Sequence, residues 1–336
     1  MPVTLRDIAK ALGVTEATVS NAINDRGKMS EETRNRVLAA VEEMGYTPNS
    51  SARRLAKNRS QTIGVIVPNI ENPFYGRLVK QITMLCKGYG YHTIIADSFE
   101  DAKTEQEAVY RMISDRIEGL LISPTNYNVP TADYVPLLEQ NKVKFCYVTT
   151  RIPHTNYPFV MTDLMAGTCM LVEHLLESGR RSIYSFVGRQ DNPIAVSRMR
   201  GYDMAFAAKG LEYQQDVFVN CSAYDYEEGF DKAVELMESG KKVDAIITSN
   251  DFMAVGVLEA LSQLGVSVPG EIAVGGYDDM FFAKTSSVPL TTVRQDVDQI
   301  SRIGVDALMK MIKTKQDYTR ATFLMPELVV RRSTEA

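Results

Sequence analysis

Apolar residues recur at helical spacing three times within the first 45 positions of the chain. The first pattern predicts a helix that Thr4 caps and that Gly13 ends. The second predicts a helix that Thr15 caps, and the third predicts a helix between Ser30 and Gly45. The apolar faces of these helices are expected to form one small core, from Leu5, Ile8, Ala9, Leu12, Val19, Ile23, Val37, Leu38, Val41 and Met44.

From Gln61 onward, short apolar runs alternate with longer segments of helical period. The runs are typical of buried strands and read TIGVIV, HTIIAD, EGLLIS and KFCYV, then SIYSFV, DAIITS and EIAVGG. The predicted helices cover about 76–87, 104–115, 134–140, 165–177, 197–208, 227–237 and 252–264. Alternating β and α segments predict parallel sheets covered on both faces, and the two series predict two similar lobes.

The second of the three predicted N-terminal helices exposes short side chains that can form hydrogen bonds, among them Glu16, Asn21 and Asn24. Two helices joined by a tight turn containing glycine are typical of a helix-turn-helix unit, which places its second helix in the DNA major groove. The predicted fold class is therefore an all-α helix-turn-helix head followed by an α/β body of two doubly wound, parallel-sheet lobes.

Charge is distributed unevenly along the chain, whose formal net charge is −5 at pH 7. The first 60 residues hold ten lysines and arginines against seven acidic residues, whereas the rest hold 27 against 35. Residues 47–60 contain Arg53, Arg54, Lys57 and Arg59 and no acidic residue. This pattern favours a polyanion-binding head on an acidic body, with a solvated basic linker as the alternative.

Composition excludes several classes of protein. The 45% apolar and 24% charged fractions are typical of globular proteins. No run approaches the roughly 20 apolar residues of a membrane span, and the start of the chain lacks a signal peptide, so we expect a cytoplasmic protein.

The four cysteines form no C-x-x-C pair, and no two of the three histidines are spaced i, i+4, which argues against a metal site. Catalytic and dinucleotide-binding motifs are absent, so we expect neither catalytic residues nor a cofactor.

Several spaced segments resemble the lactose-repressor (LacI/GalR) family of bacterial transcription factors. In the head they are TLRDIAKALGVTEATVSNAIN, ETRNRVLAAVEEMGYTPN and ARRLAKNRSQTIGVIVP. In the body they are NPFYGRLVKQI, SRMRGYDMAF, SNDFMAVGVLEAL, VPGEIAVGGYDD and PLTTVRQ, so the resemblance covers essentially the whole chain. It implies a periplasmic-binding-protein-like body that clamps a small molecule, often a sugar and sometimes a purine. It also implies a homodimeric regulator, in most cases a repressor, on a pseudo-palindromic operator.

The expected domains follow from the patterns and the resemblance together. Residues 1–46 form the helix-turn-helix domain, 47–60 a hinge helix or linker, and 61–336 the effector-binding and dimerisation domain. In the body, the N-lobe covers about 61–159 and 293–322 and the C-lobe about 160–290 and 323–331. The last residues, LVVRRSTEA, show no heptad pattern, which favours a dimer over a tetramer. The two alternatives are a solute-binding receptor, disfavoured by the head and the missing signal peptide, and an enzyme, disfavoured by the missing motifs.

The resemblance implies that the start of the second helix reads base edges. Many family members have arginine where this chain has Asn21; asparagine pairs with adenine and arginine with guanine, so we expect a changed half-site preference. Glu16 either accepts from cytosine N4 or is unfavourable near phosphates. The basic segment would be a hinge helix whose Leu55 enters the minor groove. The expected DNA-binding residues are Thr4, Glu16, Ala17, Thr18, Ser20, Asn21, Asn24, Asn49, Ala52, Arg53, Arg54, Leu55 and Lys57.

Loops at the carboxyl ends of parallel strands are expected to meet in a cleft between the lobes. Asp251 is expected to be one of the loop residues in this cleft. Arg198 would donate in a fork, Asp278 would accept from paired hydroxyls, and Phe74 and Tyr224 would cover an apolar sugar face. The alternatives are an ion pair for the charged groups and ordinary packing for the aromatic ones. By residue match, the expected effector-binding residues are Asn72, Phe74, Thr150, Arg151, Arg198, Tyr224, Asn250 and Asp278.

One departure from the family pattern bears on the effector. Many sugar-responsive members have aspartate before the arginine of the segment that here reads VTTRIP, with Thr150 before Arg151. A carboxylate that accepts from two hydroxyls is thus replaced by a single hydroxyl. The positive charges of Arg151 and Arg198 then favour a sugar acid, a modified sugar or a non-sugar over a plain hexose.

Overall fold

The computed structural model describes residues 3–27, 29–46, 60–125, 134–153, 155–190, 192–214, 216–316 and 320–335. The chain forms two compact units, Met1–Ser60 and Gln61–Ala336, which we call the head and the body. Among the described helices, none combines the length and the apolar character needed to cross a bilayer.

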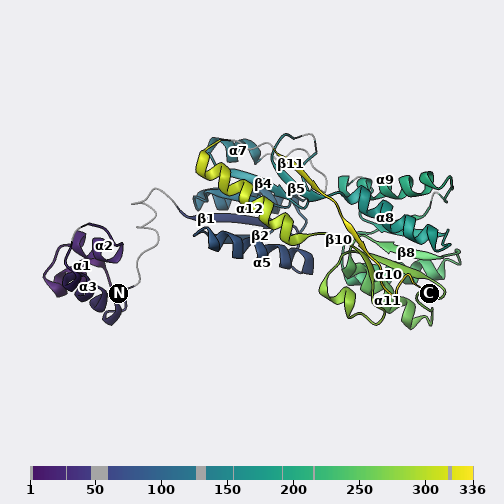
Figure 1. The fold of residues 1–336 in the computed structure, drawn as a ribbon, viewed down its shortest axis with the longest axis horizontal. Coiled ribbons are helices and arrows are strands. Elements are labelled where there is room, and N and C mark those ends of the chain that lie inside the picture. The colour runs from purple at the N-terminus through teal and green to yellow at the C-terminus, as the bar shows by residue number, and fades with distance from the viewer. Residues whose placement is uncertain are drawn as a thin grey trace. The chain divides into compact units, whose positions relative to one another are not determined.

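The head contains the three helices that the sequence predicts, α1 (Leu5–Leu12), α2 (Glu16–Ile23) and α3 (Glu31–Glu43) (Figure 1). Thr4, Thr15 and Ser30 cap these helices, each accepting from the backbone N–H three residues later, as predicted. Gly13 ends α1 in the left-handed conformation, with φ of 64°, which a residue without Cβ adopts readily.

The head core consists of Ile8, Ala9, Val19, Ala22, Val37 and Ala40. The prediction that Leu38 belongs to this core is wrong, because Leu38 is 43% exposed. Val37, which was expected in this core, and Ala40, which was not, lie three positions apart on α3 and take its inward face.

Two six-stranded sheets form the body. Sheet A contains, in spatial order, β11 (Ala321–Leu324), β5 (Phe159–Thr162), β4 (Lys144–Val148), β3 (Gly119–Ile122), β1 (Thr62–Val67) and β2 (His92–Asp97). Sheet B contains β12 (Glu327–Val329), β10 (Thr291–Arg294), β9 (Ala273–Asp278), β8 (Ala245–Thr248), β6 (Ile183–Val187) and β7 (Phe218–Asn220). All neighbouring strands pair in parallel except β10 and β12, which are antiparallel.

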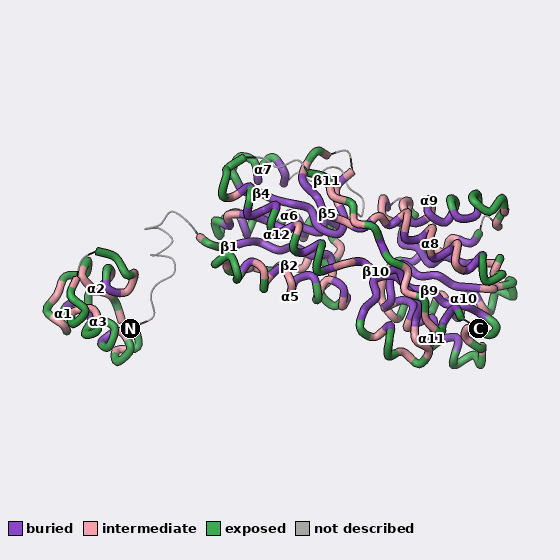
Figure 2. The backbone as a smooth tube through the Cα atoms, viewed as in Figure 1, coloured by how far each residue is buried: buried purple, intermediate pink, exposed green. Residues whose placement is uncertain are grey.

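Helices cover both faces of each sheet, as the alternating pattern predicts. On sheet A, α5 (Pro73–Gly88) packs beside α12 (Val297–Thr314), while α6 (Ala102–Ser114) and α7 (Val135–Gln140) supply a separate core cluster. On sheet B, α8 (Leu164–Glu177) packs beside α9 (Pro193–Ala208), and α10 (Tyr226–Glu238) packs beside α11 (Asp251–Gln263) (Figure 1). A short 3-10 helix, η1 (Phe281–Lys284), follows β9. Strands β1, β3, β8 and β9 are buried along their whole length, whereas the edge strand β2 is partly exposed (Figure 2).

Sheet A with its helices is the N-lobe, and sheet B with its helices is the C-lobe. The chain crosses between them three times: from β5 to α8, from β10 to α12 and from β11 to β12. Thr162, Arg294 and Leu324 still belong to the sheet before each crossing, two to four residues after the expected lobe ends at about 159, 290 and 322. The strands at the crossings have only three or four residues, too few for alternation of apolar positions to identify them.

Candidate functional site

A cleft lies between the two lobes and is lined by residues of both. It encloses about 720 Å³, the part open to solvent included. Seven of the eight residues expected to bind the effector line it: Asn72, Phe74, Thr150, Arg198, Tyr224, Asn250 and Asp278.

Arg151 is the expected residue that does not line the cleft. Its guanidinium lies 4.6 Å from the centroid of the Phe159 ring, in a cation–π contact on sheet A. The charged residues among those that line the cleft are Arg198, Glu100 and Asp278. The positive balance expected from two arginines is therefore absent from the cleft.

Two asparagines occupy equivalent places in the two lobes. Asn72 caps α5, and its Oδ1 accepts from the Phe74 backbone N–H at 3.0 Å; Asn192 caps α9 and accepts from the Ile194 N–H at 2.9 Å. Both asparagines precede a proline and both line the cleft. The Asn-Pro pair after the first strand of each lobe is the sequence signal that would have identified Asn192.

Arg198 projects from α9 into the cleft and is only 8% exposed. Its Nη2 donates to the Ser249 carbonyl at 3.0 Å, and its guanidinium lies 4.8 Å from the centroid of the Tyr277 ring. In the described part of the chain, its buried Nε has no hydrogen-bond partner. The side chain is thus fixed on one side, and its Nε N–H is a donor that a ligand can use.

Asp278 ends β9 and is 5% exposed. The Gln295 Nε2 donates to its Oδ1 at 2.7 Å. Burial raises the pKa of Asp278 to about 7, although the Gln295 hydrogen bond and the positive charge of Arg198 both act to lower it. Gln295 itself is 7% exposed, and among the described residues its Oε1 has no hydrogen-bond partner. The cleft therefore offers a carboxyl group and an amide acceptor close together.

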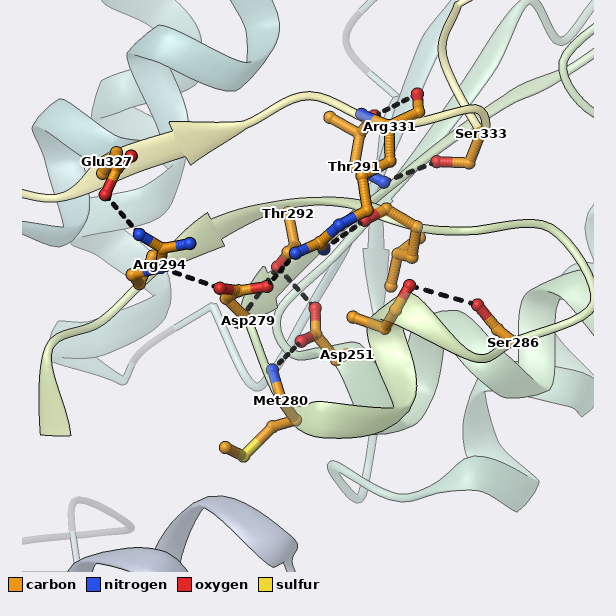
Figure 3. A network of polar contacts seen from close by, with 12 residues as sticks. Asp251, Asp279, Met280, Ser286, Thr291, Thr292, Arg294, Glu327, Arg331 and Ser333 are labelled. Carbon is orange, nitrogen blue, oxygen red and sulfur yellow. Dashed lines mark hydrogen bonds and ion pairs between the residues drawn. The ribbon is translucent and has the colours of Figure 1, made fainter.

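The residues that follow Asp278 are held by a polar network (Figure 3). Asp279 accepts from Arg294 Nε at 2.7 Å and from Arg331 Nη2, and Arg294 also pairs with Glu327 at 2.6 Å. Burial acts to raise the pKa of Asp279, but the two guanidiniums outweigh it, and the pKa lies below its ordinary value. This network connects β9, β10 and β12 close to two of the three crossings between the lobes.

Asp251 does not line the cleft, contrary to the expectation that it joins the cleft loops. It is fully buried, and it accepts from the Met280 backbone N–H at 2.7 Å and from the Thr292 hydroxyl at 2.5 Å (Figure 3). Burial, with the nearby Asp278 charge as a smaller cause, raises the pKa of Asp251 well above its ordinary value. Its role is to hold the turn after β9.

Aromatic side chains line the cleft from both lobes. Phe74 is 4% exposed and meets Tyr75 edge to face, with ring centroids 5.2 Å apart. A Cβ at Gly188 would overlap the Tyr224 ring and hydroxyl, so Gly188 leaves the space that Tyr224 occupies.

The cleft residues that sequence reasoning missed are Pro68, Tyr75, Glu100, Pro124, Thr125, Thr149, Leu164, Asn192, Ile194, Ser249 and Gln295. No group of three or more His, Cys, Asp or Glu in the described ranges is placed to hold a metal ion.

In the head, Glu16, Ala17 and Asn21 are exposed along one stretch of α2. Other expected DNA-binding residues have partners within the head: Thr4 caps α1, the Thr18 hydroxyl lies 2.8 Å from that of Thr15, and Asn24 donates to the Ser20 carbonyl at 2.7 Å. The expected residues of the hinge segment, Asn49, Ala52, Arg53, Arg54, Leu55 and Lys57, lie outside the described residues.

Comparison with known proteins agrees with this architecture. Residues 4–49 match the family described as bacterial regulatory proteins, lacI family, and residues 172–334 match the periplasmic binding protein-like domain. The ribose operon repressor of Escherichia coli (strain K12) is 29% identical over 98% of this chain and 99% of its own. The repressor PurR of Haemophilus influenzae (strain PittEE) is 28% identical over 99% of each chain.

Solved structures give the same result. The lac repressor dimer bound to operator and the anti-inducer ONPF is 26% identical, with a TM-score of 0.87 over 100% of both chains. The complex of the transcriptional regulator CelR with cellobiose is 26% identical, with a TM-score of 0.73 over 98% of this chain and 99% of that one. Head and body thus define a DNA-binding regulator with a two-lobed binding body. The chain combines a DNA-binding domain of the lacI family with a periplasmic binding protein-like domain.

Proposed function

We propose that this protein is a homodimeric repressor that acts in the cytoplasm on a pseudo-palindromic operator and responds to a small, neutral, hydroxyl-rich molecule in the cleft. Its relatives are transcriptional repressors, and the chain is a transcriptional regulator rather than an enzyme. The identity of the molecule and the contacts with DNA are the parts that need experiment.

We infer the ligand class from the polar atoms at the C-lobe side of the cleft. Arg198 Nε is a buried donor and Gln295 Oε1 a buried acceptor, and among the described residues neither has a partner. Asp278 adds a carboxyl group beside them. A hydroxyl both donates and accepts, so a polyol satisfies all three groups, while the rings of Phe74 and Tyr224 suit its apolar face.

The charges of the cleft favour a neutral ligand over a sugar acid. One guanidinium, from Arg198, faces two carboxyl groups, from Glu100 and Asp278. An anionic ligand would meet repulsion from Glu100, and from Asp278 in its ionised form, without the second arginine that the sequence pattern had suggested. Among relatives, one is named a ribose operon repressor and one structure holds cellobiose, which supports testing neutral sugars first.

Dimerisation is supported by partly exposed aromatic rings on the C-lobe. Tyr226, Phe230, Phe252, Phe282 and Phe281 form a continuous series of ring contacts, with neighbouring centroids between 5.3 and 6.5 Å apart. Phe281, at one end of the series, is 75% exposed. An exposed apolar surface of this kind is typical of a protein interface, and a two-fold dimer matches a pseudo-palindromic site.

Ligand control of DNA binding follows from the placement of the cleft between lobes that three chain crossings connect. A ligand that contacts both lobes has different affinities for different lobe orientations, and so it shifts the equilibrium between them. In a dimer, such a shift changes the spacing of the two DNA-binding heads.

A thermal-shift panel tests the ligand class. The purified full chain is heated with D-ribose, cellobiose, a sugar acid, a sugar phosphate or a purine base, and Asp278→Ala and Asp231→Ala are heated alongside. A ligand at 100 times its Kd adds about 2.7 kcal/mol of stability, a shift of a few degrees. We expect a neutral sugar to stabilise the wild type and the Asp231→Ala surface control, but not Asp278→Ala. Stabilisation by the acid alone would overturn the neutral class, and conversion of any compound to product would revive the enzyme alternative.

DNA binding and assembly are tested on the same preparation. Selection from random duplexes should return a pseudo-palindromic site, and sedimentation should give twice the monomer mass. A solute-binding receptor would select no DNA sequence.

A further inference from the structure

Glu105 is a buried carboxylate that lies outside the cleft. It sits in the first turn of α6 and is only 3% exposed. Burying a carboxylate is costly unless hydrogen bonds replace its hydration, so the groups around Glu105 indicate what it does.

The two carboxylate oxygens of Glu105 accept from two different parts of the N-lobe. The Thr125 backbone N–H donates to Oε2 at 2.5 Å, and the Tyr134 hydroxyl donates to Oε1 at 2.8 Å. Thr125 follows β3 and Tyr134 precedes α7, so one side chain holds these two points of the chain together. Burial raises the pKa of Glu105, while both hydrogen bonds act to lower it.

Thr125 links Glu105 to the cleft. Thr125 and Pro124 line the cleft, and the Thr125 hydroxyl lies 2.8 Å from the Ser98 hydroxyl. The Ser98 backbone N–H donates at 2.9 Å to the carbonyl of Val67, the last residue of β1. The carboxyl ends of β1, β2 and β3 are therefore joined by one series of hydrogen bonds that starts at Glu105.

The surroundings of Glu105 favour an acceptor role over an ion pair. No ion pair of Glu105 with a lysine, arginine or histidine occurs in the described ranges, and no cation contributes to its shifted pKa. Its own charge helps to raise the pKa of Tyr134 and of Tyr147, for both of which burial is the larger cause.

We propose that Glu105 is a positioning residue for ligand binding: it fixes the β3 side of the cleft through the Thr125 N–H without contacting the ligand. This inference rests on the proposed function of the cleft. It predicts that removing the two acceptors weakens ligand affinity in a protein that is still folded.

Three variants separate the hydrogen-bond acceptor role of Glu105 from the effects of its side-chain volume and of its charge. Glu105→Met keeps the volume and removes both acceptors. Glu105→Gln keeps one acceptor for Thr125, and the Tyr134 hydroxyl can turn to accept from the new amide. Glu107→Met is the matched control, because Glu107 lies on the same helix with half of its side chain exposed and pairs only with Arg111 in the described residues.

Titration calorimetry with D-ribose and with cellobiose, well below each variant's melting temperature, gives the first readout. We expect about tenfold weaker binding for Glu105→Met, recovery to within about threefold of wild type for Glu105→Gln, and no change for Glu107→Met. Affinity within twofold of wild type in folded Glu105→Met would overturn the proposal and leave Glu105 with a purely structural role.

Hydrogen exchange of the peptide that contains Thr125 gives a second readout, which needs no ligand. We expect faster exchange in Glu105→Met and near wild-type exchange in Glu105→Gln. Unchanged exchange in Glu105→Met would overturn the route through Thr125, whatever the affinities. If the wild type binds neither sugar, the proposed ligand class has failed, and exchange alone then decides whether Glu105 holds this side of the cleft.

Discussion

Gln295 donates from its side-chain amide to Oδ1 of Asp278 across 2.7 Å. Asp278 ends β9 in the C-lobe, whereas Gln295 follows β10 directly, at the crossing that leads into α12 of the N-lobe. Both side chains line the cleft. A ligand that binds Asp278 therefore acts next to one of the connections between the lobes, which is where a change in lobe orientation must be accommodated.

The raised pKa of Asp278 predicts a pH dependence of stability. Its pKa is about 7 in the folded chain, above the ordinary value of 3.8, so between these values the folded state binds the extra proton. The unfolding free energy therefore falls as pH rises from about 4 to about 7, by at most about 1.4 kcal/mol per pH unit for one group. Below about pH 4 the carboxyl group is protonated in both the folded and the unfolded chain, so it makes no contribution to the pH dependence of stability.

Asp278→Asn isolates this effect, because asparagine retains an oxygen that can accept from Gln295 and does not titrate. Urea unfolding at pH 4.5, 6.0 and 7.5 should show the wild type losing stability relative to Asp278→Asn across the interval. Parallel curves for the two proteins would mean that the folded pKa of Asp278 is close to its ordinary value.

Gly188→Ala should displace Tyr224 from the cleft. The new Cβ would overlap the Tyr224 hydroxyl and ring, so we expect a loss of about 1 to 3 kcal/mol in stability and about tenfold weaker ligand binding. Gly88→Ala is the matched control, since a Cβ at Gly88 meets nothing within 4 Å. In a double-mutant cycle measured by urea unfolding, Tyr224→Ala should cost less stability in the Gly188→Ala background than in the wild type. Additive costs would contradict the overlap.

Asn21→Arg should change which base the head prefers. Asn21 is exposed on α2, and asparagine pairs bidentately with adenine whereas arginine pairs with guanine, each worth about 1 to 3 kcal/mol of discrimination. Binding-site selection should therefore replace adenine by guanine at one position of each half-site. Asn35→Arg adds the same charge at an exposed position of α3 and should leave the selected bases unchanged. An unchanged selection with Asn21→Arg would limit Asn21 to phosphate or solvent contacts.

Leu55→Ala should weaken operator binding more than non-specific binding. An apolar side chain that unstacks a base step contributes mainly at a site whose sequence bends easily, whereas phosphate contacts act on all DNA. Leu38→Ala is the control, because Leu38 is an exposed leucine of the head. Fluorescence anisotropy at fixed salt, with operator and with random duplex, measures both affinities. Equal losses on the two duplexes would argue against a minor-groove wedge at Leu55.

The sequence by itself determined the local elements and seven of the residues that line the cleft. The caps at Thr4, Thr15 and Ser30 depend on a hydroxyl and a backbone N–H three residues later, so they could be predicted without tertiary structure. The long helices show a helical period of apolar residues, and the buried central strands show short continuous apolar runs. The predicted fold class is confirmed, and seven of eight expected effector residues line the cleft.

Tertiary structure decided what periodicity and motifs could not show. Thr150 and Arg151 are neighbours in sequence, yet only Thr150 lines the cleft, because the Arg151 side chain packs on Phe159. Gln295 joins the site only because the crossing after β10 brings it to Asp278, which lies 17 residues earlier. Such contacts depend on how strands distant in sequence are ordered in each sheet. Hydrophobic pattern determines which elements form, whereas packing between elements determines which polar groups meet.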